Sequence, residues 1–301
     1  MRALRPPCAP KRVVCWMSSE RDSRAPSDDS LTQVRPVRLA IGVEYDGQCF
    51  FGWQRQRQSP TVQACLEEAL GTVANHEVTI HCAGRTDTGV HARCQVAHFE
   101  TTAARSERSW VLGTNTRLHP GISLLWAKPV SDDFHARFSA CARRYRYRIL
   151  NRWVRPAVER GRASWIRHPL DADAMNLAAA SLLGEHDFSS FRAVGCQARS
   201  PVREIQDLRV TREGNEVFID IRANAFVYHM VRNIAGVLIQ IGQGLRPVSW
   251  ASEVLAARDR TKAGITAPAE GLYFVAAYYP DFPELPVERE VSFQSTVDQE
   301  S

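Results

Sequence analysis

Asp87 follows Arg85 by two residues inside a glycine-flanked segment, 84–91. This segment comes directly after 78–82, whose alternation predicts a half-buried strand, so both side chains are expected at a strand end, where functional sites often lie. A nearby guanidinium favours the anionic form of a carboxyl group, and an anionic carboxylate can attack an electrophilic carbon. The same residue types also build ordinary turns, so the motif alone leaves a structural ion pair open.

A second candidate is Arg232, the single permanently charged side chain in the apolar run 223–242. The spacing of apolar residues predicts a helix over 226–241, with Arg232 near the edge of its buried stripe. Because an unpaired charge there would be costly to desolvate, we predict that Arg232 pairs with an acid from another segment, with Asp87 as the candidate. An arginine that extends to solvent is the alternative. His229 is predicted to be a packed or edge histidine rather than a metal ligand.

Arginines are concentrated between His135 and Arg167, where ten of them stand against one acid. This charge indicates a surface for a polyanion. Within it, residues 143–149 alternate, so on a strand Tyr145 and Tyr147 would share one face and the arginines the other. Arginine suits forked contacts to phosphate and stacking on bases. A solvated strand over a tyrosine-lined core is the alternative. The residues expected to bind RNA are Arg143, Arg144 and Arg146.

The composition indicates a soluble globular protein. With 301 residues, 44% of them hydrophobic, the chain is long enough for two cores. None of its eight cysteines forms a Cys-x-x-Cys pair, so we predict reduced thiols and neither a zinc site nor a disulfide framework. Polar residues interrupt the most apolar run, which argues against a membrane span, and the N-terminus shows no secretory signal. We expect a cytoplasmic protein.

Strand and helix patterns alternate along the chain, which predicts an α+β fold with helices packed on a sheet. A comparable order occurs twice, so we expect two α+β domains, at 36–140 and 141–281. The predicted strands are 37–45, 78–82, 94–100, 122–128, 143–149, 203–211 and 216–222. One predicted helix begins near Ser59, and the three others cover 107–117, 171–183 and 226–241.

Both ends of the chain lack such patterns. Residues 1–35 are rich in Arg, Pro, Ser and Asp and are predicted to be a disordered extension; Met17 leaves a later translation start open. Residues 282–301 are acidic and polar and are predicted to be a flexible tail. Within the first domain, the pair Asp46-Gly47 reads as a turn signal. Asp46 is therefore predicted to be a turn residue rather than a second catalytic acid.

Short motifs occur in a specific order over most of the chain. They are Glu44–Gly47, Gly52–Arg55, Gly84–Asp87, Gly89–Ala92, Asp133–Phe138, Arg143–Tyr147, Asp187–Phe188, Ser190–Arg192, Ala225–Phe226, Met230–Asn233 and Glu270–Tyr273. With these motifs the chain resembles the TruA family of tRNA pseudouridine synthases from about Arg38 to Pro280. One departure is Thr88, where the family more usually has alanine, and the N-terminal extension lies outside the resemblance.

The resemblance implies a role for each of the four singled-out residues. Asp87 matches the family's catalytic aspartate and Arg85 the motif arginine before it. Arg232 matches the arginine that pairs with the aspartate, and Tyr145 the tyrosine that stacks on the target uracil. The implied fold has two ferredoxin-like α+β halves around a central groove, the pseudouridine synthase fold.

The resemblance also implies a reaction and partners. The family isomerises uridine to pseudouridine at positions 38, 39 and 40 in the anticodon stem-loop of tRNAs, as a homodimer and with neither cofactor nor metal. Two rivals differ in class: an RNA-binding protein without chemistry, and a hydrolase that releases free uracil. The presence of all four matched residues argues against the first rival.

Overall fold

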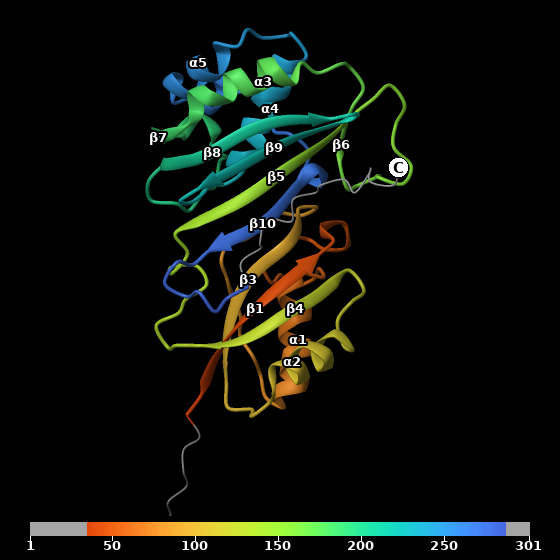
Figure 1. The fold of residues 1–301 in the computed structure, drawn as a ribbon, viewed down its shortest axis with the longest axis vertical. Coiled ribbons are helices and arrows are strands. Elements are labelled where there is room, and N and C mark those ends of the chain that lie inside the picture. The colour runs from red at the N-terminus through yellow and green to blue at the C-terminus, as the bar shows by residue number, and fades with distance from the viewer. Residues whose placement is uncertain (1–34, 287–301) are drawn as a thin grey trace, which may run out of the picture. The chain divides into compact units, whose positions relative to one another are not determined.

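The computed structural model describes residues 35–286, and the expectations for 1–34 and 287–301 lie outside this part of the chain. Within it, ten strands form one mixed sheet in the order β4-β1-β3-β10-β5-β9-β8-β7, with β2 beside β3 and β6 beside β5 (Figure 1). The strands are β1 Val37–Tyr45, β2 His81–Cys82, β3 His91–Thr101, β4 Ile122–Val130, β5 Ala142–Asn151, β6 Ser164–Ile166, β7 Gly184–Asp187, β8 Val202–Glu213, β9 Glu216–Ala223 and β10 Leu272–Tyr278.

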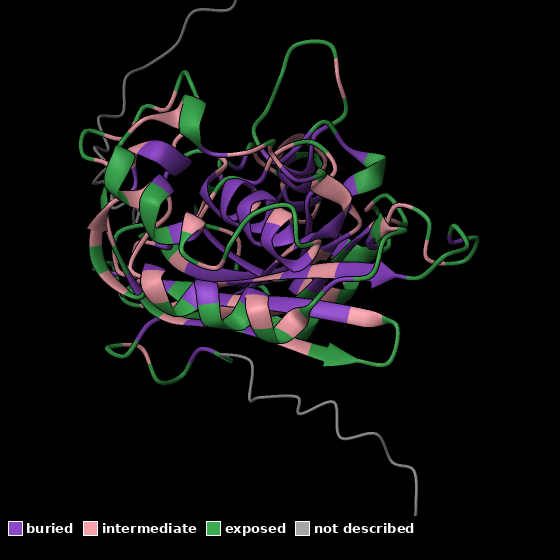
Figure 2. Ribbon diagram, turned by 90° about the horizontal axis from the view of Figure 1, so that it is seen from above, coloured by how far each residue is buried: buried purple, intermediate pink, exposed green. Residues whose placement is uncertain are grey.

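The described residues also form five α-helices. They are α1 Val62–Ala74, α2 Glu107–Asn115, α3 Ala172–Ala179, α4 Met230–Gly242 and α5 Trp250–Ala257. Helix α2 packs on β4, α3 on β8 and α4 on β5. Buried residues gather in the strands and in the helix faces that meet them (Figure 2). The predicted α+β class is confirmed. None of these helices has the length and apolar character needed to cross a bilayer.

Strand β10 joins the two predicted domains into one sheet. It runs parallel to β3, with Tyr273 opposite His91, and antiparallel to β5, with Leu272 opposite Tyr147. The last strand of the described residues therefore lies between the two halves, and residues 35–286 carry a single continuous sheet. The boundary between 36–140 and 141–281 stays a prediction.

The prediction of a flexible tail over 282–301 is wrong for the first residues of that range. Phe282 packs edge-on against Phe134, with ring centroids 4.9 Å apart, and Leu285 is buried in the core. The acidic composition after Pro280 hid these two apolar anchors, whose burial removes apolar surface from water.

Helix α4 begins later than its apolar pattern predicts. The preceding residue, His229, has φ +61°, a left-handed conformation that cannot continue a right-handed helix. Residues 226–229 therefore form an irregular lead into the helix. From Met230 onwards eleven of the thirteen helical residues are buried, so α4 is a core helix.

Strand β5 has the predicted alternation. Tyr145, Tyr147 and Ile149 are buried, whereas the arginines between them are only partly buried. The tyrosine face thus packs inward, and the arginine face is reachable from solvent.

The segment 84–91 is held from several sides. The Thr86 carbonyl oxygen accepts from the Trp53 N–H at 3.0 Å, and the Thr86 hydroxyl lies 2.8 Å from the Tyr45 hydroxyl. The Gly84 carbonyl oxygen accepts from the Gln95 amide at 2.6 Å. Gly52 makes the approach possible: its φ is +84°, and a Cβ on it would lie 2.8 Å from the Thr86 oxygen. Glycine is required there for both its conformation and its size.

Three imidazoles meet beside β3. The ring centroids of His98 and His135 lie 4.6 Å apart, and those of His81 and His98 lie 5.2 Å apart. His98 is 4% exposed, and its Nδ1 accepts from the Ala136 N–H at 3.2 Å. Burial, together with the neighbouring His135 and His81, lowers the pKa of His98 to about 4. The folded protein thus keeps His98 neutral.

Gly52→Ala should destabilise the protein more than Gly195→Ala. Gly195 has nearly the same φ, +83°, but open space around it. Both substitutions add a left-handed alanine, at about 1–2 kcal/mol. Only Gly52→Ala also forces the Thr86 carbonyl to move, which should add about 1–3 kcal/mol. Urea unfolding of both variants measures the difference, and equal losses would contradict the close approach.

Stability should fall as the pH drops from about 6.5 towards 4. The unfolded chain takes up a proton on His98 near its usual pKa of 6.5, whereas the folded protein does so only near 4, so acid favours unfolding in this window. Above 6.5 the contribution is fully present. In the variant His98→Gln, the unfolding free energy should depend less steeply on pH across the window. Identical slopes in the two proteins, from denaturant titrations at each pH, would refute the role of His98.

Candidate active site

The structure brings Asp87 and Arg232 together, as predicted. Arg232 Nη1 lies 3.5 Å from Asp87 Oδ2. The Asp87 side chain is 29% exposed, so it is held by the protein and still reachable from outside. The two residues come from opposite parts of the chain: Asp87 from the loop between β2 and β3, and Arg232 from the first turn of α4.

Arg232 does not extend to solvent. Its Nε donates to the Ala267 carbonyl oxygen at 2.8 Å, and the Ala267 N–H donates back to the Arg232 carbonyl oxygen at 3.1 Å. The first bond restrains the guanidinium, and the second holds the backbone of Arg232 beside Ala267. The positive charge of Arg232 is therefore held near Asp87.

His229 is a third member of the site, whereas the sequence predicted only a packed or edge histidine. Its Nε2 lies 3.2 Å from Asp87 Oδ2 and accepts a hydrogen bond from Arg232 Nη1 at 3.4 Å. Burial lowers the pKa of His229, against the opposing effect of the Asp87 carboxylate. No pattern in the sequence marks this contact, because His229 precedes helix α4 in a left-handed conformation.

Arg85 does not pair with Asp87. It is exposed and takes part in no ion pair or hydrogen bond with any other described residue. The guanidinium that holds the carboxylate is that of Arg232, because Arg85 lies on the solvent side of the loop. The expectation that Arg85 stabilises the charge of Asp87 is thus corrected.

Tyr145 lies next to Gly84, at the start of the segment 84–91. It is 8% exposed, and its ring meets Phe226 and Phe274 edge-on, at centroid distances of 5.0 and 5.1 Å. A Cβ on Gly84 would lie 3.5 Å from its hydroxyl oxygen. Burial raises the pKa of Tyr145, so the phenol is neutral. Its accessible surface is confined to a small part of the side chain.

Arg143 has a structural position. It is 9% exposed, and its guanidinium donates to the carbonyl oxygens of Ala83, Ala140 and Asn224 at 2.9 to 3.4 Å, and also to that of Arg137. A side chain whose donors are taken by the backbone is not free for phosphate, so the expected RNA contact is corrected. Arg143 instead fixes Ala83, the residue before the 84–91 segment.

Arg144 and Arg146 point to the other face of β5 and share one acid. Their Nη2 atoms lie 3.2 and 2.8 Å from the carboxylate oxygens of Asp220, on β9. Both side chains are partly exposed. They remain available at the surface, but Asp220 offsets part of their charge.

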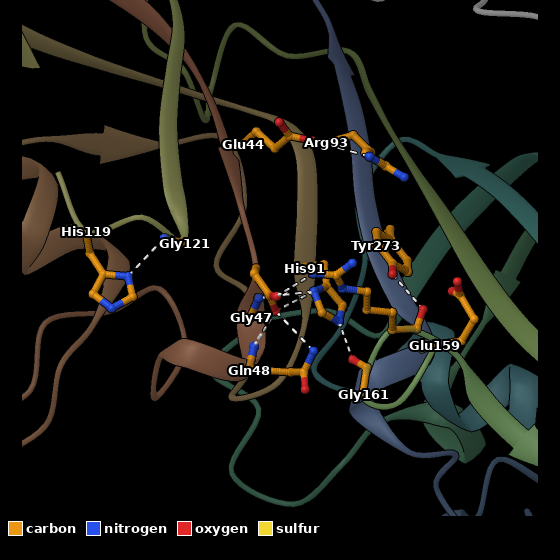
Figure 3. A network of polar contacts seen from close by, with 12 residues as sticks. Glu44, Gly47, Gln48, His91, Arg93, His119, Gly121, Glu159, Gly161 and Tyr273 are labelled. Atoms are coloured by element: carbon orange, nitrogen blue, oxygen red, sulfur yellow. Dashed lines mark hydrogen bonds and ion pairs between the residues drawn. The ribbon is translucent and has the colours of Figure 1, made fainter. Parts of the chain in front are cut away.

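His91 fastens the other end of the 84–91 segment (Figure 3). Its Nδ1 accepts from the Gly47 N–H at 3.1 Å, its Nε2 donates to the Gly161 carbonyl oxygen at 2.9 Å, and its ring stacks on Tyr273. Asp46 accepts from the Gln48 N–H at 3.0 Å and begins a short 3₁₀ helix. Asp46 is therefore a turn residue, as predicted.

The arrangement suits acid–base or nucleophilic chemistry. One carboxylate, partly exposed and held by a guanidinium and an imidazole, can attack a carbon or accept a proton. Within residues 35–286 no three His, Cys, Asp or Glu side chains are grouped so that they could hold a metal ion.

Comparison with known proteins agrees with the site. The chain matches the tRNA pseudouridine synthase family over residues 41–139 and 178–280. It is 55% identical over 253 residues to tRNA pseudouridine synthase A of Xylella fastidiosa (strain M23), covering 84% of this chain and 98% of the relative. It is 57% identical over 250 residues to the enzyme of the same name from Nitrosococcus oceani, covering 83% and 96%.

A third relative, tRNA pseudouridine synthase A of Pectobacterium atrosepticum, is 56% identical over 245 residues, covering 81% of this chain and 87% of its own. The family match includes Asp87 and Arg232 in its two segments. Both the extent and the identity are those of close members of one family. The chain therefore belongs to the TruA-type tRNA pseudouridine synthases, which are isomerases.

Proposed function

We propose that this isomerase converts uridine to pseudouridine at positions 38, 39 and 40 in the anticodon stem-loop of tRNAs, with Asp87 as the nucleophile. The observation that carries the assignment is the geometry of one carboxylate. Asp87 is partly exposed, and its Oδ2 lies 3.5 Å from Arg232 and 3.2 Å from His229. The support for the three tRNA positions is the resemblance of the motifs.

The reaction requires an acid of this kind. The C1′–N1 bond of uridine breaks, the uracil turns, and its C5 joins C1′, so no atoms are gained and no net oxidation occurs. Positive charge develops at C1′, and an anionic carboxylate stabilises it, as in glycoside hydrolysis. Asp87 acts either by bonding to C1′ or by removing a ribose proton. In both routes the Asp87 carboxylate is the reacting group, and the Arg232 guanidinium lies 3.5 Å from it.

The target nucleotide must leave its stack to reach Asp87, at a cost of a few kcal/mol. Tyr145 is our candidate for the residue that receives the uracil, because aromatic contact offsets part of this cost. With 8% of its surface exposed, Tyr145 would meet the base through one small area beside the loop. A dry site would also keep the detached uracil close and water away from C1′.

The exposed Arg85 is our candidate for a phosphate contact next to the target nucleotide. Its guanidinium is exposed beside Asp87 and forms no ion pair in the described part of the chain, so binding a phosphate would break no internal contact. Arg144 and Arg146 are weaker candidates, because each already contacts Asp220. A homodimer in the cytoplasm is part of the proposal, supported by the resemblance alone.

Replacing the nucleophile should abolish the reaction. Asp87→Asn keeps the size of the side chain but removes its charge, so pseudouridine formation should fall by roughly 10⁴-fold or more, with tRNA affinity largely kept. The measurement is the mapping of pseudouridines, and of free uracil, after tRNA is incubated with purified protein. Asp207→Asn, on β8, is the matched control and should retain full activity.

Wild-type activity in Asp87→Asn would refute the role of Asp87. Free uracil in place of pseudouridine with the wild-type protein would show the hydrolase instead. If the wild-type protein binds tRNA but leaves it unmodified, the protein is an RNA-binding protein without catalytic activity.

Tyr145 should tolerate phenylalanine better than leucine. No hydrogen bond of its hydroxyl is present among the described contacts, so Tyr145→Phe keeps the ring and should lose less than about 10-fold in rate. Tyr145→Leu removes the aromatic contact with the base, worth about 1–3 kcal/mol, and should lose about 10- to 100-fold. Single-turnover rates, measured at a temperature where both variants are folded, decide the point. Equal losses would mean that stacking is the wrong role.

A further inference from the structure

Phe138 holds a large aromatic ring in solvent on the segment between β4 and β5. It is 75% exposed, more than any other aromatic side chain in the described part of the chain. A single exposed apolar residue is ordinary, but this ring has an imidazole and a guanidinium beside it. The His135 ring packs on it, with centroids 4.3 Å apart, and the guanidinium carbon of Arg137 lies 5.5 Å from its centroid. We call the side chains of His135, Arg137 and Phe138 the aromatic platform.

The platform lies on an ordered turn, 135–139. The His135 N–H donates to the Ser139 hydroxyl, and the Ser139 N–H donates to the His135 carbonyl oxygen, both at 2.9 Å. The His135 Nδ1 accepts from the N–H groups of Arg137 and Phe138, at 3.1 and 3.3 Å. Because these bonds fix the backbone of the turn, the exposed ring is held in place before any partner binds, which lowers the entropy cost of binding.

The turn lies beside the loop that carries the proposed nucleophile. The Arg143 guanidinium donates to the carbonyl oxygen of Ala83, at 3.3 Å, and to that of Arg137. Ala83 directly precedes the loop, so one side chain ties the turn to the start of the loop. Burial raises the pKa of the Cys82 thiol, and the positive charges of Arg85 and Arg137 act against it. Both arginines are exposed, and their guanidinium groups therefore lie near the start of the loop.

Exposed arginines next to an exposed aromatic ring suit single-stranded nucleic acid. Every base has a π-face that can stack on an aromatic side chain, and guanidinium groups bind the phosphates on either side of that base. Proteins recognise RNA sequences mainly through unpaired bases, because a paired base is enclosed in its helix. A contact with another protein would need the apolar surface of Phe138 but not the charges of Arg85 and Arg137. The ring and the charges together therefore favour RNA over a protein partner.

We propose that one unpaired base of the tRNA anticodon loop stacks on the aromatic platform, while Arg85 and Arg137 contact the neighbouring phosphates. The inference rests on the proposed function, which brings this part of the tRNA to Asp87. Bases of the loop are already unpaired, so stacking one of them on Phe138 breaks no base pair. The stacked base fixes where the RNA lies on the protein and so helps to select the uridine that is everted.

The test separates an aromatic contact from an apolar one. Phe138→Leu keeps an apolar side chain but loses the ring, so the Kd for a purified tRNA should rise by about 5- to 50-fold. Phe138→Trp should bind within about twofold of wild type. Leu177→Ala, at an equally exposed apolar residue on α3, is the matched control and should bind as wild type. All three sites are on the surface, so thermal unfolding should change little.

The stacked base is identified with tRNAs that each lack one base of the anticodon loop. For one of them, the loss of affinity caused by Phe138→Leu should disappear, because the ring and the base act as a pair. Wild-type affinity in Phe138→Leu would overturn the inference, as would the same loss for every one of these tRNAs. A change of oligomeric state in Phe138→Leu, measured by sedimentation, would show a contact between protein chains instead.

The proposed function is read separately, from pseudouridine formation by the wild-type protein. If wild type forms pseudouridine and Phe138→Leu binds tRNA normally, only the platform is refuted. If wild type forms none, the proposed function is refuted, whatever the affinities of the variants.

Discussion

The site depends on the contact between one carboxylate and one guanidinium that lie 145 positions apart in the chain. Asp87 alone, on a surface loop, would be an ordinary acid that rotates in water. Arg232 alone, in a helix with eleven buried residues, would be a poorly solvated charge. Each group makes the other's position favourable, so the loop and the helix are held in one arrangement. The proposed function and the stability of this arrangement therefore depend on the same ion pair.

The rest of the fold holds the two partners still. Strand β10 lies between β3 and β5 and so ties the strand after the loop to the strand that carries Tyr145. The loop itself is fastened at its start by Arg143, in its middle by Trp53 and at its end by His91. These contacts use backbone carbonyls, so the buried side chains of Arg143 and His91 fix the backbone around the loop that carries Asp87. Such rigid support lets a catalytic group keep its geometry without substrate.

Much of this arrangement could be predicted from the sequence. The alternation of β5 determines which residues face inward, and the isolated charge of Arg232 in an apolar run requires a partner. Both patterns lie within short segments of the chain, so one sequence is enough to recognise them. The roles of Arg143 and Arg85 could not be read in this way, because two arginines of identical chemistry differ only in what surrounds them. His229 was missed because its left-handed backbone, which turns the ring toward Asp87, leaves no mark in composition or period. Phe282 and Leu285 were hidden by acidic neighbours.

In the proposed function, the carboxylate of Asp87 is the group presented to the target sugar, and Arg232 lies 3.5 Å from it. A crystal structure of the Asp87→Asn variant bound to an anticodon stem-loop would test it most directly. The proposed function predicts an everted uridine whose C1′ lies about 3–3.5 Å from a terminal side-chain atom of residue 87, with Arg232 still in contact with that side chain. A target uridine that remains stacked in the RNA, or a sugar approached from the side of Arg232, would contradict it.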